Sequence, residues 1–256
     1  MHEIIGRQNE IAKIRTYIDE MRSVHIYGRE GAGKTAIFEH IYDNWNELHK
    51  PLIPIFCRTS RTLREILTRI AGFLLWHSGN LQHIDKFKRS KQIQYQSELK
   101  AINSRYLKNI IFRNMSSKKF CVILDHLEYV TPKINAFLSP LQNIAMTITA
   151  SRQSWDIEDY SFTACLEYCL WLLPKVKIEN LSKNDTFSLM KLIAGDSFKV
   201  NENLFAEVYS ITKGNAGLTK EVLTKALMPE YCIDGRINLG LVMLDLEIER
   251  VKEVKI

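Results

Sequence analysis

The feature that most constrains this chain is residues 28–35, which read Gly-Arg-Glu-Gly-Ala-Gly-Lys-Thr. The segment satisfies the spacing GxxxxGK[ST], in which the second glycine is followed at once by lysine and a hydroxyl side chain. Residues 23–27 directly before it predict a short strand, and Ile37 and Ile41 after it lie at the spacing of one helix face. A strand, a glycine-rich turn and a helix in this order favour an α/β domain with a parallel sheet.

The composition of this turn meets the requirements of a phosphate-binding loop, or P-loop. Glycines reach positive φ without strain, so successive N–H groups can face phosphate oxygens, and the helix that begins at Lys34 adds the positive end of its dipole. The Lys34 ammonium is expected to bridge the β- and γ-phosphates of ATP, and the Thr35 hydroxyl to ligate Mg²⁺. The alternative, a glycine turn without a ligand, is disfavoured by the strand and helix on either side. The residues of this segment predicted to bind the cofactor are Gly28, Glu30, Gly31, Ala32, Gly33, Lys34, Thr35 and Ala36.

A second segment, residues 120–125, reads Phe-Cys-Val-Ile-Leu-Asp. Its five consecutive apolar residues predict a strand that is buried on both faces. Asp125 follows at the carboxyl end, where its carboxylate would hold the water shell of Mg²⁺ opposite Thr35. Thr35 and Asp125 are therefore the predicted metal site, and Lys34 and Asp125 are predicted to be catalytic.

The residue that activates the attacking water is expected close to Asp125. Many P-loop ATPases place glutamate directly after the aspartate, whereas His126 stands there in this chain. Glu128, three residues past Asp125, is therefore the predicted catalytic base. Two alternatives remain open: Glu128 is a solvated surface acid, or hydrolysis is slow.

Strand and helix patterns alternate up to about residue 178, and only helical patterns follow. The expected fold class is α/β: a three-layer P-loop NTPase core with a parallel sheet over residues 1–175, then a small all-helical lid over residues 176–256. Within the core, residues 1–22 form a leading segment and a helix. One long basic helix is expected to end near Met115. Further strands are expected at 52–57, 145–150 and 175–178, and helix N-caps at Thr62, Thr131 and Ser182.

The segment before the first helix, residues 5–10, reads Ile-Gly-Arg-Gln-Asn-Glu. It resembles the hGRxxE opening of the AAA+ and STAND branch of P-loop ATPases. That branch includes origin-recognition, archaeal-type and transposition-helper ATPases, and the NACHT and apoptotic-scaffold proteins. The resemblance implies that Ile5 and Gly6 lie near the adenine base. The spacing from Asp125 to Glu128 looks like the strand end of NACHT proteins.

Two later segments extend this resemblance. Residues 148–152, Ile-Thr-Ala-Ser-Arg, resemble the TSR strand end of STAND proteins. This implies that Arg152 is a catalytic residue that senses the γ-phosphate, and the alternative is a solvated arginine at a strand end. Residues 214–218, Gly-Asn-Ala-Gly-Leu, resemble the lid motif GxP(L), with Ala216 in the place of the expected proline. Lys220 is a candidate substitute for the absent lid-sensor arginine.

The basic residues are concentrated in one segment. The chain has a net charge of +6, and residues 86–119 hold ten Lys or Arg and one acid, Glu98. This segment therefore contributes +9 and the remainder −3 (6 − 9). Clustered Lys and Arg neutralise nucleic-acid phosphates, so double-stranded DNA is the predicted partner, with a solvated helix face as the alternative. The charges expected to share one face of the basic helix are those of Lys100, Arg105, Lys108 and Arg113.

Three functions fit these features. The first is an ATP-hydrolysing assembly factor that forms a homo-oligomer and acts on DNA with an unknown partner protein. The second is a nucleotide switch in signalling or defence that does not bind nucleic acid. The third, from another class, is a P-loop scaffold that binds nucleotide without turnover.

The sequence gives no sign of membrane insertion or secretion. Apolar runs such as residues 169–173 are far shorter than the ~18–20 residues of a membrane span. The N-terminus lacks the basic and apolar stretches of a signal peptide. The five cysteines lack zinc-ligand spacing. A cytoplasmic location is therefore expected, without a membrane partner.

Overall fold

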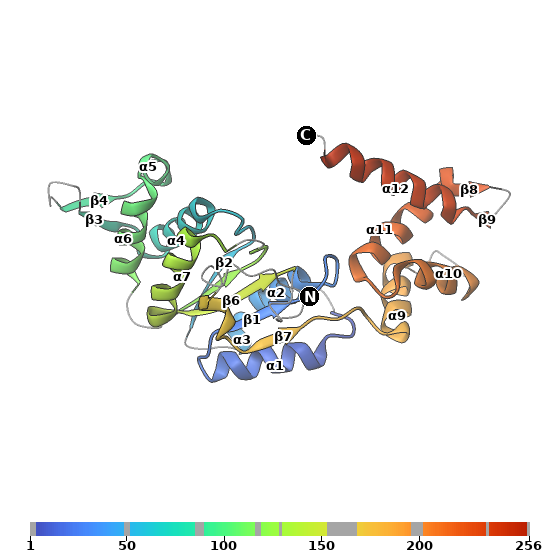
Figure 1. The fold of residues 1–256 in the computed structure, drawn as a ribbon, viewed down its shortest axis with the longest axis horizontal. Coiled ribbons are helices and arrows are strands. Elements are labelled where there is room, and N and C mark those ends of the chain that lie inside the picture. The colour runs from blue at the N-terminus through green and yellow to red at the C-terminus, as the bar shows by residue number, and fades with distance from the viewer. Residues whose placement is uncertain are drawn as a thin grey trace. The chain divides into compact units, whose positions relative to one another are not determined.

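The structure is a computed structural model that describes residues 4–48, 52–84, 90–115, 119–127, 130–152, 168–195, 202–233 and 236–254. The chain forms two compact units, which we call the sheet unit and the helical unit (Figure 1). Residues Arg29–Gly33 of the glycine-rich segment group with the C-terminal helices. The sheet unit comprises Asn9–Gly28 and Lys34–Ile178, and the helical unit comprises Met1–Gln8, Arg29–Gly33 and Glu179–Ile256.

A five-stranded sheet with the order β2-β5-β6-β1-β7 forms the centre of the sheet unit. All neighbouring strands run parallel, which confirms the predicted parallel sheet. Every residue of the inner strands β5 and β6 is buried, as expected for strands with helices on both faces. The strands are β1 (Val24–Tyr27), β2 (Ile53–Cys57), β5 (Phe120–Leu124), β6 (Met146–Ser151) and β7 (Lys175–Lys177).

Two of the predicted helix caps lie in the sheet unit. The Thr62 side chain accepts a hydrogen bond from Glu65 N, and the Glu65 carboxylate accepts from the Thr62 backbone, which is the predicted capping box. Thr131 caps the helix that has Pro132 in its first turn, as predicted. The helices are α1 (Gln8–Asp19), α2 (Lys34–Asp43), α3 (Trp45–Leu48), α4 (Leu63–Ser78), α5 (Gln96–Ala101), α6 (Ser104–Asn114), α7 (Pro132–Ile144) and α8 (Tyr168–Trp171).

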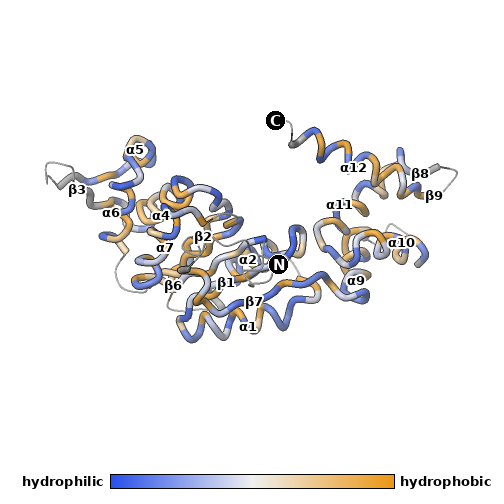
Figure 2. The backbone as a smooth tube through the Cα atoms, in the orientation of Figure 1, coloured by the Kyte–Doolittle hydropathy of each residue, from blue (hydrophilic) through white to orange (hydrophobic). Residues whose placement is uncertain are grey.

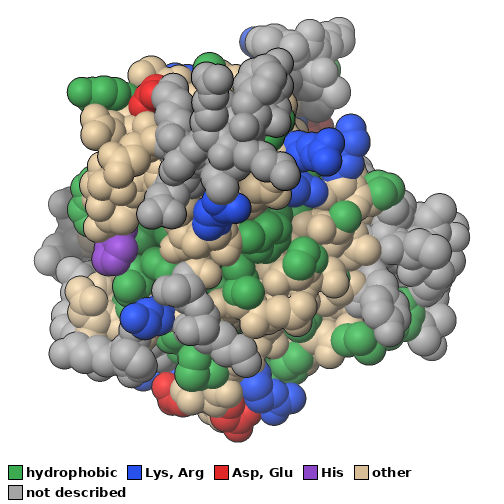
Figure 3. Space-filling view, turned by 90° about the vertical axis from the view of Figure 1, so that its left-hand side faces the viewer, with side chains coloured by type: hydrophobic (Ala, Val, Ile, Leu, Met, Phe, Trp, Pro, Cys, Tyr) green, Lys and Arg blue, Asp and Glu red, His purple; other side chains and the backbone are tan. Residues whose placement is uncertain are grey.

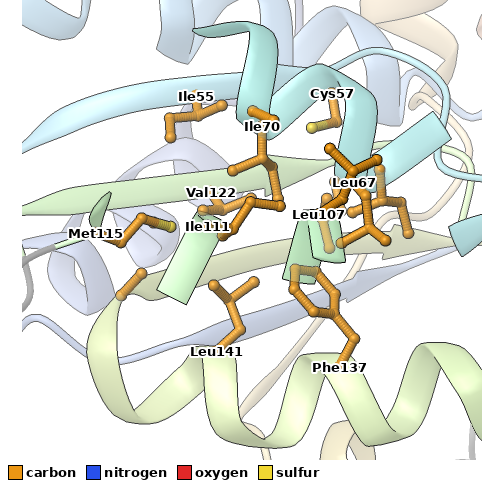
Figure 4. Close-up of a cluster of buried hydrophobic side chains, with 14 of the residues drawn as sticks. Ile55, Cys57, Leu67, Ile70, Leu107, Ile111, Met115, Val122, Phe137 and Leu141 are labelled. Atoms are coloured by element: carbon orange, nitrogen blue, oxygen red, sulfur yellow. The ribbon is translucent and has the colours of Figure 1, made fainter. Parts of the chain in front are cut away.

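Alternate residues of β2 show how the sheet separates two layers of helices. Ile55 and Cys57 belong to a hydrophobic cluster with residues of α4, α6 and α7 (Figure 4). Phe56, between them, points to the other face and contacts Phe38 of α2, with ring centroids 6.3 Å apart. Because side chains alternate along a strand, both faces of the sheet are covered and three layers result.

The prediction of one long basic helix is wrong. The structure has an antiparallel pair, β3 (Leu81–Ile84) and β4 (Ser90–Ile93), followed by the two separate helices α5 and α6. Ile102 and Asn103 are extended between these helices, with ψ of 133° and 160°. The Asn103 side chain accepts a hydrogen bond from Tyr106 N at 3.0 Å and caps α6. Asparagine favours such a cap over a helix interior, so a new helix starts here.

The helical unit has a hydrophobic core of its own. Its first helix is capped by Ser182, which accepts from Asp185 N at 3.1 Å, as predicted. Both hydrophobic and hydrophilic residues occur along α12 (Figure 2). Of its hydrophobic residues, Val242 is buried and Leu244 is exposed. A short antiparallel strand pair means that this unit is not all-helical. Its elements are α9 (Lys183–Ala194), α10 (Glu202–Thr212), α11 (Ala216–Ala226), the 3₁₀ turn Pro229–Tyr231, β8 (Cys232–Ile233), β9 (Arg236–Ile237) and α12 (Leu239–Val254).

Among the described residues, no helix combines the length and the apolar character that crossing a bilayer requires.

Candidate nucleotide-binding site

The glycine-rich segment forms the tight turn that its sequence predicts. Gly33 has a φ of +100°, which residues with a side chain rarely adopt. A Cβ on Gly28 would lie 2.3 Å from the Ile178 carbonyl oxygen, so this position requires glycine. Helix α2 begins at Lys34, where the first backbone N–H groups of a helix lack helical partners and favour an anion. Of the other predicted residues in this segment, Ala32 is buried, and Glu30 and Ala36, the latter in α2, are exposed.

Two side chains of the sheet unit meet at the start of α2. The Thr35 hydroxyl donates a hydrogen bond to Asp125 Oδ2 at 2.7 Å. Asp125 is 1% exposed, and its Oδ1 accepts from the His126 backbone N–H at 2.8 Å. The Lys34 ammonium donates to the Gly28 carbonyl oxygen at 2.6 Å. The structure thus places the two predicted metal-binding side chains in direct contact.

The pair formed by Thr35 and Asp125 has the chemistry of a partial Mg²⁺ site. Mg²⁺ is commonly held by one or two protein oxygens together with waters and phosphate oxygens, not by a full cage of side chains. Across the described ranges, no group of three or more His, Cys, Asp or Glu side chains could hold a metal ion. The residues therefore fit an ion that a bound nucleotide helps to coordinate.

His126, which follows Asp125, has an unusual backbone conformation. Its φ is +56°, in the left-handed region that few residues other than glycine adopt. Its ring atom Nδ1 lies 3.1 Å from the Arg58 carbonyl oxygen, so the side chain is directed to the end of β2. No residue near His126 indicated this turn in advance. Glu128 lies outside the described residues, so its role as the catalytic base stays a prediction.

The carboxyl ends of three adjacent strands carry the predicted site residues. Strand β6 lies between β5 and β1 in the sheet. Asp125 follows β5, Arg152 follows β6, and the glycine-rich turn follows β1. Parallel strands end at the same edge of a sheet, which is where ligands bind in open α/β sheets. Arg152 is exposed at this edge, and its proposed contact with a γ-phosphate stays a prediction.

A buried histidine links two of these strands, and sequence reasoning did not identify it. His25 of β1 is 0% exposed. Its Nδ1 lies 2.7 Å from Thr149 Oγ1 and its Nε2 lies 3.0 Å from Ser151 Oγ, both on β6. Burial, aided by the nearby Lys175 charge, lowers the pKa of His25 to about 3, so the ring is neutral. The available signal was His25 in one short apolar strand and polar residues at alternate positions of another, Thr147, Thr149 and Ser151.

The predicted adenine-pocket residues line a cavity within the helical unit. The cavity has a volume of about 390 Å³. Gly6 has a φ of +66°, and a Cβ there would lie 2.5 Å from Asp185 Cγ of α9. The walls combine apolar and polar side chains, as small-molecule sites usually do. Sequence reasoning named Ile5 and Gly6, whereas the full lining is Ile4, Ile5, Gly6, Gln8, Asp185, Ser188 and Leu192.

The basic residues predicted to contact DNA do not share one helix face. Lys100 lies on α5, while the other three lie on α6. The Lys108 ammonium is 5.9 Å from the Phe137 ring centroid, and burial lowers its pKa, so this side chain faces α7. Arg105 and Arg113 are exposed. On the face drawn in Figure 3, Lys and Arg side chains form separate groups between apolar ones. Residues 86–89 and 116–118 lie outside the described residues.

A family model described as "Nephrocystin 3, N-terminal" matches residues 5–153, which is more than half of the chain. The chain belongs to this family. The match contains the glycine-rich turn, strand β5 with Asp125 after it, and Arg152. No curated protein matches the chain.

Solved structures resemble nearly the whole chain. The ORC1 protein of Aeropyrum pernix, solved in complex with DNA, is 13% identical with a TM-score of 0.67, and the match covers 98% of this chain and 68% of that one. A Walker-type ATPase of Pyrococcus abyssi is 16% identical with a TM-score of 0.57, covering 98% and 76%. The ORC2 protein of Aeropyrum pernix, in ADPNP–ADP complexes, is 14% identical with a TM-score of 0.58, covering 94% and 67%. This member of the Nephrocystin 3 N-terminal family therefore has the fold of AAA+-type P-loop ATPases.

Proposed function

We propose that this protein binds ATP with Mg²⁺, hydrolyses it, and assembles in a nucleotide-dependent way. The observation that carries the proposal is the 2.7 Å hydrogen bond from Thr35 Oγ1 to Asp125 Oδ2. It joins two side chains that are 90 positions apart in the sequence. A glycine turn without a ligand has no need of a buried carboxylate beside its hydroxyl, whereas a Mg²⁺–nucleotide site does.

The residues of the loop suit the phosphates. The Lys34 ammonium is held by the Gly28 carbonyl, and phosphate oxygens would be stronger acceptors because they carry charge. Thr35 and Asp125 would hold Mg²⁺, which when bound neutralises charge on the phosphate oxygens. The cavity at Ile5 and Gly6 would accept the base, since it offers apolar walls and a few polar groups.

Turnover further requires a base and a residue that responds to the γ-phosphate. We assign these roles to Glu128 and Arg152. The place of Arg152 at the carboxyl end of β6, between the strands that precede Asp125 and the glycine-rich turn, supports its role. Glu128 is supported by its three-residue distance from Asp125 in the sequence.

A matched pair of variants at Thr35 tests the proposal. Thr35→Ser keeps the hydroxyl and should retain Mg²⁺-dependent phosphate release. Thr35→Val keeps the shape, loses the hydroxyl and leaves the buried Asp125 carboxylate without this donor, so its release of phosphate should fall to the level with EDTA. Phosphate release across a Mg²⁺ titration measures both. Equal activity of the two variants would contradict the proposed metal site.

Double-stranded DNA is the second candidate ligand. We propose that exposed charges of residues 86–119, among them Lys100, Arg105 and Arg113, contact duplex phosphates. The ORC1 protein with the same fold was solved with DNA, which supports the choice of this ligand.

Salt dependence tests the DNA proposal. Reversing Arg105 and Arg113 to Glu should weaken binding to every sequence and reduce the slope of log K against log salt by about 2, at roughly 0.9 per contact. Lys108→Gln is the control, because its ammonium lies against Phe137. Absence of DNA binding at about 50 mM salt, with or without an ATP analogue, would leave the nucleotide switch as the function.

The organisation proposed for this activity is an ATPase core over residues 1–175 and a lid over residues 176–256. We further propose a homo-oligomer that acts on a partner protein. Light scattering after size exclusion, with and without an ATP analogue, tests the assembly. An unchanged monomer in both conditions would contradict it.

A further inference from the structure

Three consecutive carbonyl groups of the glycine-rich loop are held by hydrogen bonds within the helical unit. The Asn215 side chain donates from Nδ2 to the Glu30 oxygen at 2.7 Å. The Gly217 backbone N–H donates to the Gly31 oxygen at 2.8 Å. The Arg7 guanidinium donates to the Ala32 oxygen at 2.7 Å. These donors come from the segment before α1 and from the start of α11, two regions far apart in the sequence.

The Asn215 side chain has a second bond that fixes its orientation. Its Oδ1 accepts from Leu218 N at 3.0 Å and caps α11. The amide therefore spans from the first turn of α11 to the loop, with one end on each. The approach is close, because a Cβ on Gly31 would lie 2.3 Å from Asn215 Oδ1 and a Cβ on Gly217 would lie 2.9 Å from Gly31 Cα. Glycine is required on both sides of this contact.

Arg7 supports the next part of the loop in the same way. It is 5% exposed. Besides the Ala32 oxygen, its guanidinium donates to the Glu179 oxygen at 2.7 Å. A buried guanidinium needs such acceptors, because a buried charge without hydrogen bonds is costly. Hydrogen bonds therefore hold the loop from two directions, the start of α11 and the segment before α1.

A held carbonyl also fixes the N–H group that follows it. In a planar trans peptide, the C=O of one residue and the N–H of the next point in opposite directions. The bond from Asn215 to the Glu30 oxygen therefore directs the Gly31 N–H away from α11. The bond from Arg7 to the Ala32 oxygen likewise directs the Gly33 N–H away from the Arg7 guanidinium. The intervening Ala32 N–H bonds within the loop, to the Arg29 oxygen at 3.2 Å.

We propose that Asn215 is a positioning residue of the nucleotide site. It acts through the Glu30–Gly31 peptide, whose N–H it holds ready for a phosphate oxygen, with Arg7 performing this task for Gly33. The inference rests on the proposed binding of nucleotide to the loop. It adds that the affinity for phosphates depends on a residue at the start of α11, 185 positions from the loop.

Asn215→Asp and Asn215→Ser separate this role from helix capping. Aspartate and serine cap helices about as well as asparagine, so α11 should keep its cap. Both lose the donor to the Glu30 oxygen. Nucleotide affinity should therefore fall by about tenfold or more in each, and equally for ATP and ADP, because P-loop N–H groups hold the α- and β-phosphates that both share.

A control variant elsewhere in the chain tests whether replacing a capping asparagine by aspartate is itself harmful. Asn103→Asp makes the same change at the N-cap of α6, where the side chain accepts from Tyr106 N and belongs to the sheet unit. This variant should bind ATP as the unsubstituted protein does. Isothermal calorimetry measures the affinities, and thermal unfolding without nucleotide should give similar midpoints for all four proteins.

Hydrogen exchange of the loop backbone separates positioning of the loop from support of α11, because a residue that only stabilises α11 would not change exchange in the loop. In Asn215→Ser, peptides that cover residues 29–33 should exchange faster, while peptides of α11 should be unchanged. If only Asn215→Asp weakens nucleotide binding, repulsion by the added charge explains the loss of affinity and the inference is wrong. If both variants bind nucleotide normally, the inference is wrong and the proposed function stands. If the unsubstituted protein binds no nucleotide, both are wrong.

Discussion

The buried histidine predicts a specific dependence of stability on pH. His25 is neutral in the folded protein because its pKa is lowered from 6.5 to about 3, whereas in the unfolded chain it takes up a proton below pH 6.5. The unfolded chain therefore binds more protons between these values, and stability is lost as the pH falls through this window. The loss is about 1.4 kcal/mol for each pH unit below 6.5, or roughly 2 kcal/mol at pH 5.

Urea denaturation of the unsubstituted protein and of His25→Gln at pH 7.5 and pH 5.0 measures the loss of stability that His25 causes. The difference between the two proteins in the loss of unfolding free energy removes the contributions of the other titrating groups. The unsubstituted protein should lose about 2 kcal/mol more of its free energy of unfolding between these pH values than the variant. Equal losses would refute the argument that the ring is neutral. If His25→Gln fails to fold, nuclear magnetic resonance of the unsubstituted protein decides, because a His25 ring that titrates near pH 6.5 would give the same refutation.

Three further predictions concern catalysis and packing. Arg152→Ala should weaken the binding of ATP but not of ADP in calorimetry, since only ATP has a γ-phosphate. Equal losses of affinity for both nucleotides would mean that the role of Arg152 is structural. Glu128→Gln should slow phosphate release by about 10²-fold or more while ATP stays bound. If His126→Ala slows phosphate release and Glu128→Gln does not, the histidine is the base. Leu67→Ala should cost about 2–5 kcal/mol in urea unfolding, because this side chain is 0% exposed in the core, and a cost below about 1 kcal/mol would contradict the packing.

The parts of the fold that the sequence predicted have strong local signals. Residues 120–124 are apolar without interruption, and they form an inner strand of the sheet. Thr62 and Glu65 stand at the spacing of a capping box, and the structure contains it. Thr35 ends the glycine-rich motif and Asp125 ends the apolar segment, so the sequence predicts both as parts of one metal site. Each of these signals lies within a few consecutive residues, so one sequence is enough to detect it.

The parts that were missed depend on contacts between distant residues or on a competing local preference. Helical spacing continued through Ile102, and only the capping preference of Asn103 indicated a break there. His25 appears in the sequence as one polar residue in a short strand, and its partners are more than 120 positions away. Asn215 was interpreted as part of a lid motif, while its bond to the Glu30 oxygen depends on the folded chain. The spacing of residues along the sequence does not show which distant side chains pair.

Calorimetric titration of the protein with ATP, in the presence and absence of Mg²⁺, tests the central claim most directly. The Lys34 ammonium and the Thr35–Asp125 pair predict binding at one site per chain that Mg²⁺ strengthens. Lys34→Ala should abolish tight binding, because it removes the charge that faces the phosphates, while thermal unfolding without nucleotide should show that the variant is folded. The same affinity in the variant and the unsubstituted protein, with no effect of Mg²⁺, would contradict the account.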